Sequence, residues 1–236
     1  MDFSTFTPEF LALGGIWYLA FLFSTVCHEA AHGLTAKLGG DTTASEGGQA
    51  SLNPLPHILR EPIGIVVVPL VSYLLNGWMM GWASAPYDPS WQRLHPRRAA
   101  WMALAGPAAN FTLMLLAAAG LRAGIALGYF HVPEYSTIAK LVGVTNPPAY
   151  GFAASLLSVF FSLNLLLGTF NLLPVPPLDG STVVALFLSE EKALRWFDFL
   201  HSAGLGLAGL MIAWIVFGRM FHFIFGLALH FLFLGT

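Results

Sequence analysis

The sequence predicts an all-α polytopic membrane protein with about 4–6 transmembrane helices and a re-entrant or short β element on the cytoplasmic side. Of the 236 residues, 56% are hydrophobic and only 9% are charged, whereas about 25% are charged in an ordinary globular protein. The apolar residues also gather into runs of the length that a bilayer-spanning helix needs. Since no polar stretch is long enough for a separate soluble domain, we expect a single membrane-embedded domain over residues 1–236.

Charge and cysteine content exclude several classes of protein. The formal net charge is -2, which gives no support for a nucleic-acid partner. Met1–Asp2–Phe3 contains no basic residue, so we expect the first apolar run to be a retained helix rather than a cleaved signal peptide. The single cysteine, Cys27, excludes an intramolecular disulfide framework, and we interpret it as a packing residue.

The first half of the chain predicts one long helix and an irregular segment. Residues 10–38 form the first expected helix, of which Phe10 to Val26 is uncharged. Residues 39–97 are expected to hold a polar loop, a short strand and a re-entrant hairpin. The strand is expected over Gly48–Asn53, where small, polar and apolar residues alternate. Residues 62–87 are uncharged but interrupted by Asn76–Gly77, a plausible hairpin turn.

The second half predicts further spanning helices. A helix is expected over 98–127, with the uncharged span 99–121 bounded by arginines. The segment 149–180 reads as an uncharged helix that prolines bring to an end, followed by a turn. Residues 202–235 are compatible with one long tilted helix, two short helices, or a helix followed by an interfacial stretch.

Basic residues predict the orientation, because cytoplasmic loops are enriched in lysine and arginine. Residues 37–98 and 179–201 are then cytoplasmic, and 122–148 and the N-terminus lie outside. Residues 62–87 must in that case enter and leave the membrane on the same side. If they crossed it completely, the motifs described next would lie on opposite sides. The residues behind this assignment are Lys37, Arg60, Arg93, Arg97 and Arg98, then Lys192 and Arg195, against Arg122 and Lys140.

The first expected helix carries the pattern His28-Glu29-Ala30-Ala31-His32. Two histidines four residues apart lie on one helical face, where they can share a Zn²⁺ ion. Glu29 lies close enough to act as a general base on a water bound to that ion. Ionisable side chains at membrane depth are costly and point to function.

A zinc site needs a third ligand, and Asp179 is the outstanding candidate. The prolines after Leu173 extend the chain, and Gly180 permits a turn directly behind the carboxylate. Asp179 is expected at the cytoplasmic end of a helix parallel to the one that carries His32, at similar depth.

A further motif, Gly106-Pro107-Ala108-Ala109-Asn110, lies about 12–18 Å inside the antiparallel helix. Its small residues allow close helix packing. Asn110 can then hydrogen-bond a ligand, a bound water or a developing oxyanion, or serve only to join helices.

These elements, in this order, resemble the site-2 protease family of intramembrane zinc metalloproteases. The family pattern consists of HExxH, GPxxN and NxxPxPxLDG, and the chain matches each specified position over roughly residues 20–190. The third motif is matched by Asn171, Pro174, Pro176, Leu178, Asp179 and Gly180. The chain has no room for the PDZ or CBS domain that many members carry.

The resemblance implies specific roles. His28, His32 and Asp179 would be ligands of Zn²⁺, and Glu29 would take a proton from the zinc-bound water and pass it to the leaving amine. Asn110 and Asn171 would support the site or the substrate, although Asn171 could equally be a helix C-terminal cap. The implied partners are the lipid bilayer and a membrane protein substrate whose transmembrane segment is cleaved; the oligomeric state is left open.

Two further expectations concern substrate and rival functions. A substrate helix must unwind to be cut, and we expect Gly48–Asn53 or Ala83–Tyr87 to hold it as an added strand. The rival function is that of a non-proteolytic membrane metal-binding protein or transporter, but the chain lacks a path of further ligands. The remaining histidines are expected not to be ligands, namely His57, His95, His131, His201, His222 and His230.

Overall fold

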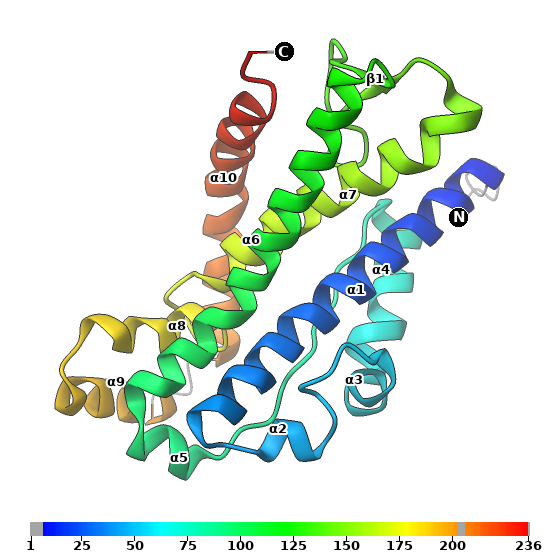
Figure 1. Ribbon diagram of the computed structural model, residues 1–236. Coiled ribbons are helices and arrows are strands. Elements are labelled where there is room, and N and C mark those ends of the chain that lie inside the picture. The colour runs from blue at the N-terminus through cyan, green and yellow to red at the C-terminus, as the bar shows by residue number, and fades with distance from the viewer. Residues whose placement is uncertain (1–6, 203–205, 236) are drawn as a thin grey trace.

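The computed structural model describes residues 7–202 and 206–235 and confirms the all-α polytopic architecture. Among the described residues, four helices are long and apolar enough to cross a membrane. They are α1 (Pro8–Gly39), α6 (Pro96–Ala126), α7 (Pro147–Asn171) and α10 (Gly206–Leu232). The protein is therefore a multi-pass membrane protein, and Figure 1 shows these helices running along the long dimension of the molecule.

Shorter elements fill the connections. Two lie between α1 and the hairpin segment, namely α2 (Thr43–Glu46) and α3 (Pro54–Arg60). The hairpin segment contains a π-helical turn, η2 (Ile63–Val67), and α4 (Val68–Asn76). The other short elements are α5 (Pro89–Leu94), β1 (Phe130–His131), β2 (Gly143–Val144), α8 (Asp179–Val183), η3 (Val184–Phe187) and α9 (Glu190–Ser202).

Helices α1, α6 and α7 pack against one another and form the centre of the bundle, while α10 contacts α7 from the side. The first helix begins where Thr7 accepts a hydrogen bond from the Phe10 amide and Pro8 supplies a preset φ. It ends at Gly40, which adopts the left-handed conformation with φ of 101°. Helix α10 is one continuous helix, which decides among the alternatives left open for residues 202–235.

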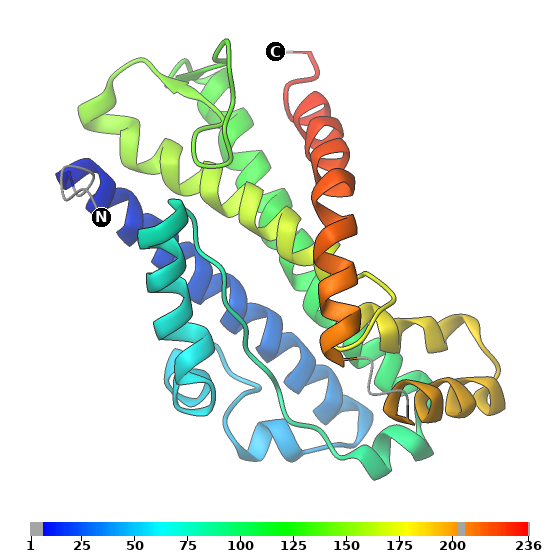
Figure 2. The same cartoon turned by 180° about the vertical axis from the view of Figure 1, so that it is seen from behind.

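The segment after Pro62 folds into the expected hairpin. After Pro62, η2 and α4 run up along α1 to Gly77, which ends α4 with φ of 75°, and the chain then returns without regular structure to α5. Figure 2 shows that the segment leaves and rejoins the same end of the molecule. Tyr73 fastens it to α1, because its hydroxyl donates to the Phe10 carbonyl over 2.6 Å. Its re-entry into a bilayer stays a prediction.

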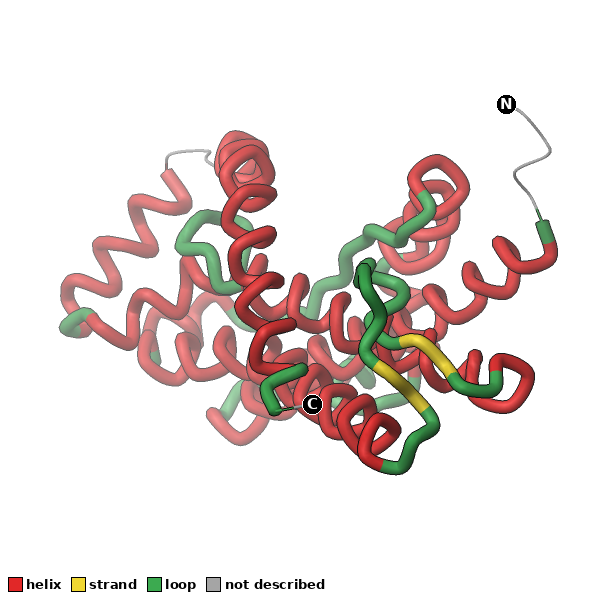
Figure 3. The backbone as a smooth tube through the Cα atoms, turned by 90° about the horizontal axis from the view of Figure 1, so that it is seen from above, coloured by secondary structure: helices red, strands yellow, loops and turns green. Residues whose placement is uncertain are grey.

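The strand expected over Gly48–Asn53 is wrong. Gly48 has a φ of 80° within a turn, and Asn53 accepts a hydrogen bond from the Leu55 amide and so begins α3. Residues committed to a turn and a helix cap cannot continue a strand. The two-stranded antiparallel sheet lies instead in the connection between α6 and α7, where β1 pairs with β2 (Figure 3).

Two apolar clusters hold the bundle together. One lies around Trp17 and Phe21 of α1 and joins the hairpin to α7. The other lies around Leu121 of α6 and Leu141 and seats the sheet-bearing connection on α7 and α10. The metal-binding candidates lie below both clusters, toward the end at which α1 finishes.

Candidate metal centre

Three side chains from distant parts of the chain converge on one point. His28 Nε2 lies 3.0 Å from His32 Nε2 and 3.1 Å from Asp179 Oδ2. His32 Nε2 lies 3.3 Å from Asp179 Oδ1. Within the described part of the chain, this is the one group of three or more ligand-type side chains gathered closely enough to hold a metal ion. The structure thus brings together all three residues that the sequence singled out.

The geometry of α1 explains the two histidines. They lie four residues apart, so they stack on one face of the helix, and both are buried. His32 lies seven residues before Gly39, about 10 Å from that end of a helix that is about 48 Å long. The pair therefore lies nearer one end of the bundle than the other.

Asp179 reaches this pair because the chain turns back sharply after α7. Helix α7 ends at Asn171, and Asp179 is the first residue of α8. A Cβ on Gly180 would stand 2.2 Å from the Leu172 carbonyl oxygen. Gly180 is therefore required for the close approach of two backbone segments, rather than for the unusual turn conformation that we expected.

Gly106 lets α6 approach the histidines. A Cβ on Gly106 would lie 2.4 Å from His32 Nε2 and 2.6 Å from His28 Nε2. The first residue of the GPxxN motif thus leaves open the space in front of the two ring nitrogens. Any side chain at this position would fill that space.

The other ring nitrogens face hydrogen-bond acceptors. His32 Nδ1 donates to the Met102 carbonyl over 2.7 Å, and His28 Nδ1 donates to Asn110 Oδ1 over 2.6 Å. A neutral imidazole that donates from Nδ1 carries a lone pair at Nε2. Both Nε2 atoms therefore offer lone pairs toward each other and toward the Asp179 carboxylate.

Such an arrangement fits a cation. Two lone pairs and a carboxylate within about 3 Å repel one another unless a positive charge lies between them. Asp179 Oδ2 is buried and forms no hydrogen bond of normal geometry, although His28 Nε2 lies within ion-pairing distance. Tetrahedral Zn²⁺ holds nitrogen and oxygen ligands at about 2.0–2.1 Å, which places the ligands roughly 3.3 Å apart. The observed separations and the donor set match those of a three-ligand zinc site.

Glu29 is buried next to this cluster and close enough to His32 for an electrostatic interaction. Burial of a carboxylate within a spanning helix is costly, which is consistent with a chemical role. Asn110 lies at the cluster and is fully buried. Asn171, in contrast, is the last residue of α7, and among the described residues its side chain forms no hydrogen bond to the cluster.

Sequence reasoning missed Asn164 and Ser24. Asn164 hydrogen-bonds Asn110 and Ser24, and both missed residues are fully buried. The signals were an asparagine among the apolar residues of the 149–178 segment, seven residues before Asn171, and a serine four residues before His28, on the same helical face. Both were passed over because neither belongs to a motif.

The fold and the site together define a polytopic membrane protein with a buried His–His–Asp cluster beside a buried glutamate. The model of peptidase family M50 matches residues 16–211. Because that match covers most of the chain, the protein belongs to this family, which is that of the site-2 proteases. The resemblance seen in the motifs is thereby confirmed.

One relative supports the same conclusion. The chain is 29% identical over 167 residues to "Putative zinc metalloprotease YwhC" of Bacillus subtilis (strain 168). The aligned residues make up 70% of this chain. The match spans 66% of that relative, slightly less than two thirds of its length. No solved structure matches the chain.

Proposed function

We propose that the protein is a zinc endopeptidase that hydrolyses peptide bonds within transmembrane segments of other membrane proteins. The observation that carries the proposal is the convergence of His28, His32 and Asp179 beside Glu29 inside a bundle of spanning helices. The cluster lies among helices that are long and apolar enough to span a membrane, so the substrates next to it would be membrane-embedded peptides.

The residues divide the chemistry among them. A zinc ion in this site would polarise the scissile carbonyl and lower the pKa of a water to about 7. Glu29 serves as the general base that takes the proton of the attacking water and delivers it to the leaving amine. His28 and His32 are held in the metal-binding tautomer by Asn110 and the Met102 carbonyl. Asn171 remains a candidate for substrate support.

The substrate has to be extended before it can be cut, because a helix hides its carbonyl groups in hydrogen bonds. Residues 83–87 of the returning hairpin arm run without regular structure, and their backbone forms no backbone hydrogen bond within the described ranges. Arms of this kind accept an added strand through their free amides and carbonyls. We propose Ala83–Tyr87 as the surface that holds the substrate.

The metal site is proposed to lie in the cytoplasmic half of the membrane. The site lies near the end at which α1 finishes. The connection that follows carries Arg60 and Arg93, and Arg97 lies in the first turn of α6. Segments rich in basic residues stay on the cytoplasmic side. A cytoplasmic site would release soluble fragments into the cytoplasm.

A cleavage assay tests the proposal. Purified protein in detergent with Zn²⁺ is expected to cut a model transmembrane substrate, and Glu29→Gln is expected to reduce the rate by roughly 10²–10⁴-fold while retaining zinc. Glu191→Gln, at an exposed position in α9, is the matched control. If Glu29→Gln cleaves as fast as the native protein, the mechanism is wrong. Zinc content that survives combined His28→Ala and Asp179→Ala substitution would refute the site.

A further inference from the structure

A buried asparagine that belongs to none of the three motifs lies behind the metal centre. Asn164, in the middle of α7, is 0% exposed. Its Nδ2 donates to the Phe160 carbonyl over 2.8 Å and to Ser24 Oγ over 2.9 Å. Its Oδ1 accepts a hydrogen bond from Asn110 Nδ2 over 2.9 Å. The amide thus uses both of its donor hydrogens and its acceptor oxygen, and it joins α7 to α1 and α6.

The Phe160 carbonyl determines the direction of all these hydrogen bonds. The Phe160 carbonyl can only accept, so the nitrogen of Asn164 must face it and the oxygen must face Asn110. Asn110 must then turn its own nitrogen toward Asn164, which leaves its oxygen facing His28.

At His28 the direction of these hydrogen bonds determines which ring nitrogen carries the hydrogen. Asn110 Oδ1 can only accept, so His28 Nδ1 must carry a hydrogen. The lone pair of the neutral ring is then at Nε2, which faces His32 and Asp179. A backbone carbonyl in α7 therefore determines which nitrogen of a histidine in α1 can bind a metal.

We propose that Asn164 is a positioning residue, which fixes the tautomer of His28 by holding the amide of Asn110 in one orientation. The proposal rests on the metal site proposed above. Without the acceptor oxygen of Asn164, the Asn110 amide is free to rotate by 180° and present its nitrogen to His28. His28 would then carry its hydrogen on Nε2, where it blocks metal binding.

Ser24 completes the arrangement on the side of α1. It lies four residues before His28 and so projects from the same helical face. By accepting from Asn164, it ties the position of that amide to the helix that carries the histidines. The network therefore closes through α1, α6 and α7, and each hydrogen bond holds the next in place.

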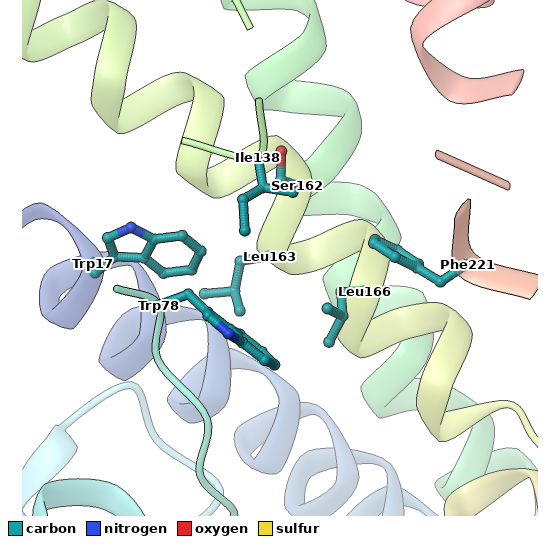
Figure 4. Close-up of a pocket in the computed structure, with 7 residues that line it drawn as sticks. All are labelled: Trp17, Trp78, Ile138, Ser162, Leu163, Leu166 and Phe221. Atoms are coloured by element: carbon teal, nitrogen blue, oxygen red, sulfur yellow. The ribbon is translucent and has the colours of Figure 1, made fainter. Parts of the chain in front are cut away.

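Zinc affinity measures this role directly. Asn164→Leu keeps a similar volume but removes the acceptor, and we expect zinc, titrated against a chromophoric chelator, to bind roughly 10–100-fold more weakly. Ser162→Ala is the matched control on the same helix. Ser162 is buried against a small apolar pocket with Trp17 and Phe221 (Figure 4), and its hydroxyl has no partner in the described part of the chain. Its loss should leave zinc affinity unchanged.

A second substitution separates positioning from simple packing. Asn110→Asp places acceptor oxygens on both sides of the group, so no rotation can present a donor to His28. Carboxylates are also common partners of metal-binding histidines. In an Asn110→Asp background, Asn164→Leu should therefore weaken zinc binding far less than it does in the native background.

The outcomes are distinct. A large loss with Asn110 present and a small loss with Asn110→Asp supports the proposal. Equal losses in both backgrounds mean that Asn164 only packs the helices, and native affinity in Asn164→Leu also overturns the proposal. If Asn164→Leu does not fold, the same comparison is made with the smaller Asn164→Ala. Native protein that binds no zinc would refute the proposed function itself, which this comparison distinguishes from a failure of Asn164.

Discussion

Gly106 and His32 lie so close together that a single methyl group at Gly106 would stand 2.4 Å from His32 Nε2. The same carbon would lie 2.6 Å from His28 Nε2. Both distances are shorter than any normal contact between nonbonded atoms. The absence of a side chain at Gly106 is therefore a condition for the ligand cluster to exist.

We expect Gly106→Ala to abolish zinc binding and peptidase activity, because the methyl group fills the space in front of both ring nitrogens. Zinc content of the purified variant provides the measurement. Gly151→Ala, also in a long helix but with open space around its Cβ, is the control and should bind zinc normally. Full zinc content in Gly106→Ala would show that the metal is held elsewhere.

Removal of the metal should lower thermal stability as well as activity. A chelator is expected to lower the thermal midpoint, since a ligand bound only to the folded state stabilises it by RT ln(1 + [L]/Kd). It would also leave two lone pairs and a carboxylate facing one another. Added Zn²⁺ should restore the midpoint. His32→Ala should show no response to chelator, and a shift of native size in that variant would contradict the assignment.

Tyr73 should contribute to stability in two separable ways. Tyr73→Phe removes the hydrogen bond to the Phe10 carbonyl and is expected to cost about 1 kcal/mol. Tyr73→Ala also removes a buried ring that packs against Phe10 in a tilted arrangement, with ring centroids 4.6 Å apart, and is expected to cost about 3–5 kcal/mol. Thermal unfolding in detergent measures both. Tyr135→Phe, at an exposed position, should have no effect; equal costs for the two Tyr73 variants would mean that the ring does not anchor the hairpin.

Asp41 makes the stability depend on pH. Burial alone would raise the pKa of its carboxyl, but hydrogen bonds from the Thr43 amide, the Thr43 hydroxyl and the Asp88 amide outweigh burial and hold the pKa below its usual value of 3.8. A carboxyl with a depressed folded-state pKa stabilises the fold above its unfolded pKa. That contribution is lost as the pH falls through the folded-state pKa.

We therefore expect Asp41→Asn to cost about 1–2 kcal/mol at pH 7 and progressively less below about pH 4. Thermal midpoints of the native protein and the variant, compared across this range, test the expectation. Asp198→Asn, which alters an exposed ion pair with Arg93, serves as the control. A cost that stays constant down to acid pH would show that Asp41 acts without its charge.

Single cysteines test the proposed orientation. In a Cys27→Ala background, Thr137→Cys lies in the connection between α6 and α7, and Glu46→Cys lies in α2 at the other end of the bundle; both positions are exposed. A membrane-impermeant maleimide should label Thr137→Cys in intact cells, and Glu46→Cys only after permeabilisation. The reverse pattern would place the metal site in the outer half of the membrane.

The ligand residues could be predicted from the sequence because their chemistry restricts them strongly. His28 and His32 share a helical face by spacing alone, and the prolines before Asp179 exclude a continued helix. The hairpin followed from the orientation of the motifs together with Asn76–Gly77. In each case a local rule and a global constraint indicated the same structure.

The rest depended on contacts between distant segments. Phe130 pairs with Val144 in a sheet of two residues per strand, which is too short to leave a pattern in the sequence. Gly48 was misread because its positive φ, which places it in a turn rather than a strand, is visible only in the structure. Asn164 acquires its role from its hydrogen bonds to Phe160, Asn110 and Ser24 together. These four residues lie on three different helices, so no single segment of the sequence shows the arrangement.

Under the proposed cleavage of transmembrane segments, the position of His28 and His32 near one end of α1 has a consequence for the products. A spanning segment of about 20 residues that is cut at this depth is divided into unequal pieces. The shorter piece keeps only a few apolar residues and readily leaves the lipid for water, whereas the longer piece retains enough apolar length to stay embedded. The off-centre position of the ligands would thus determine which fragment of a substrate is released from the membrane, without any site that recognises the fragments.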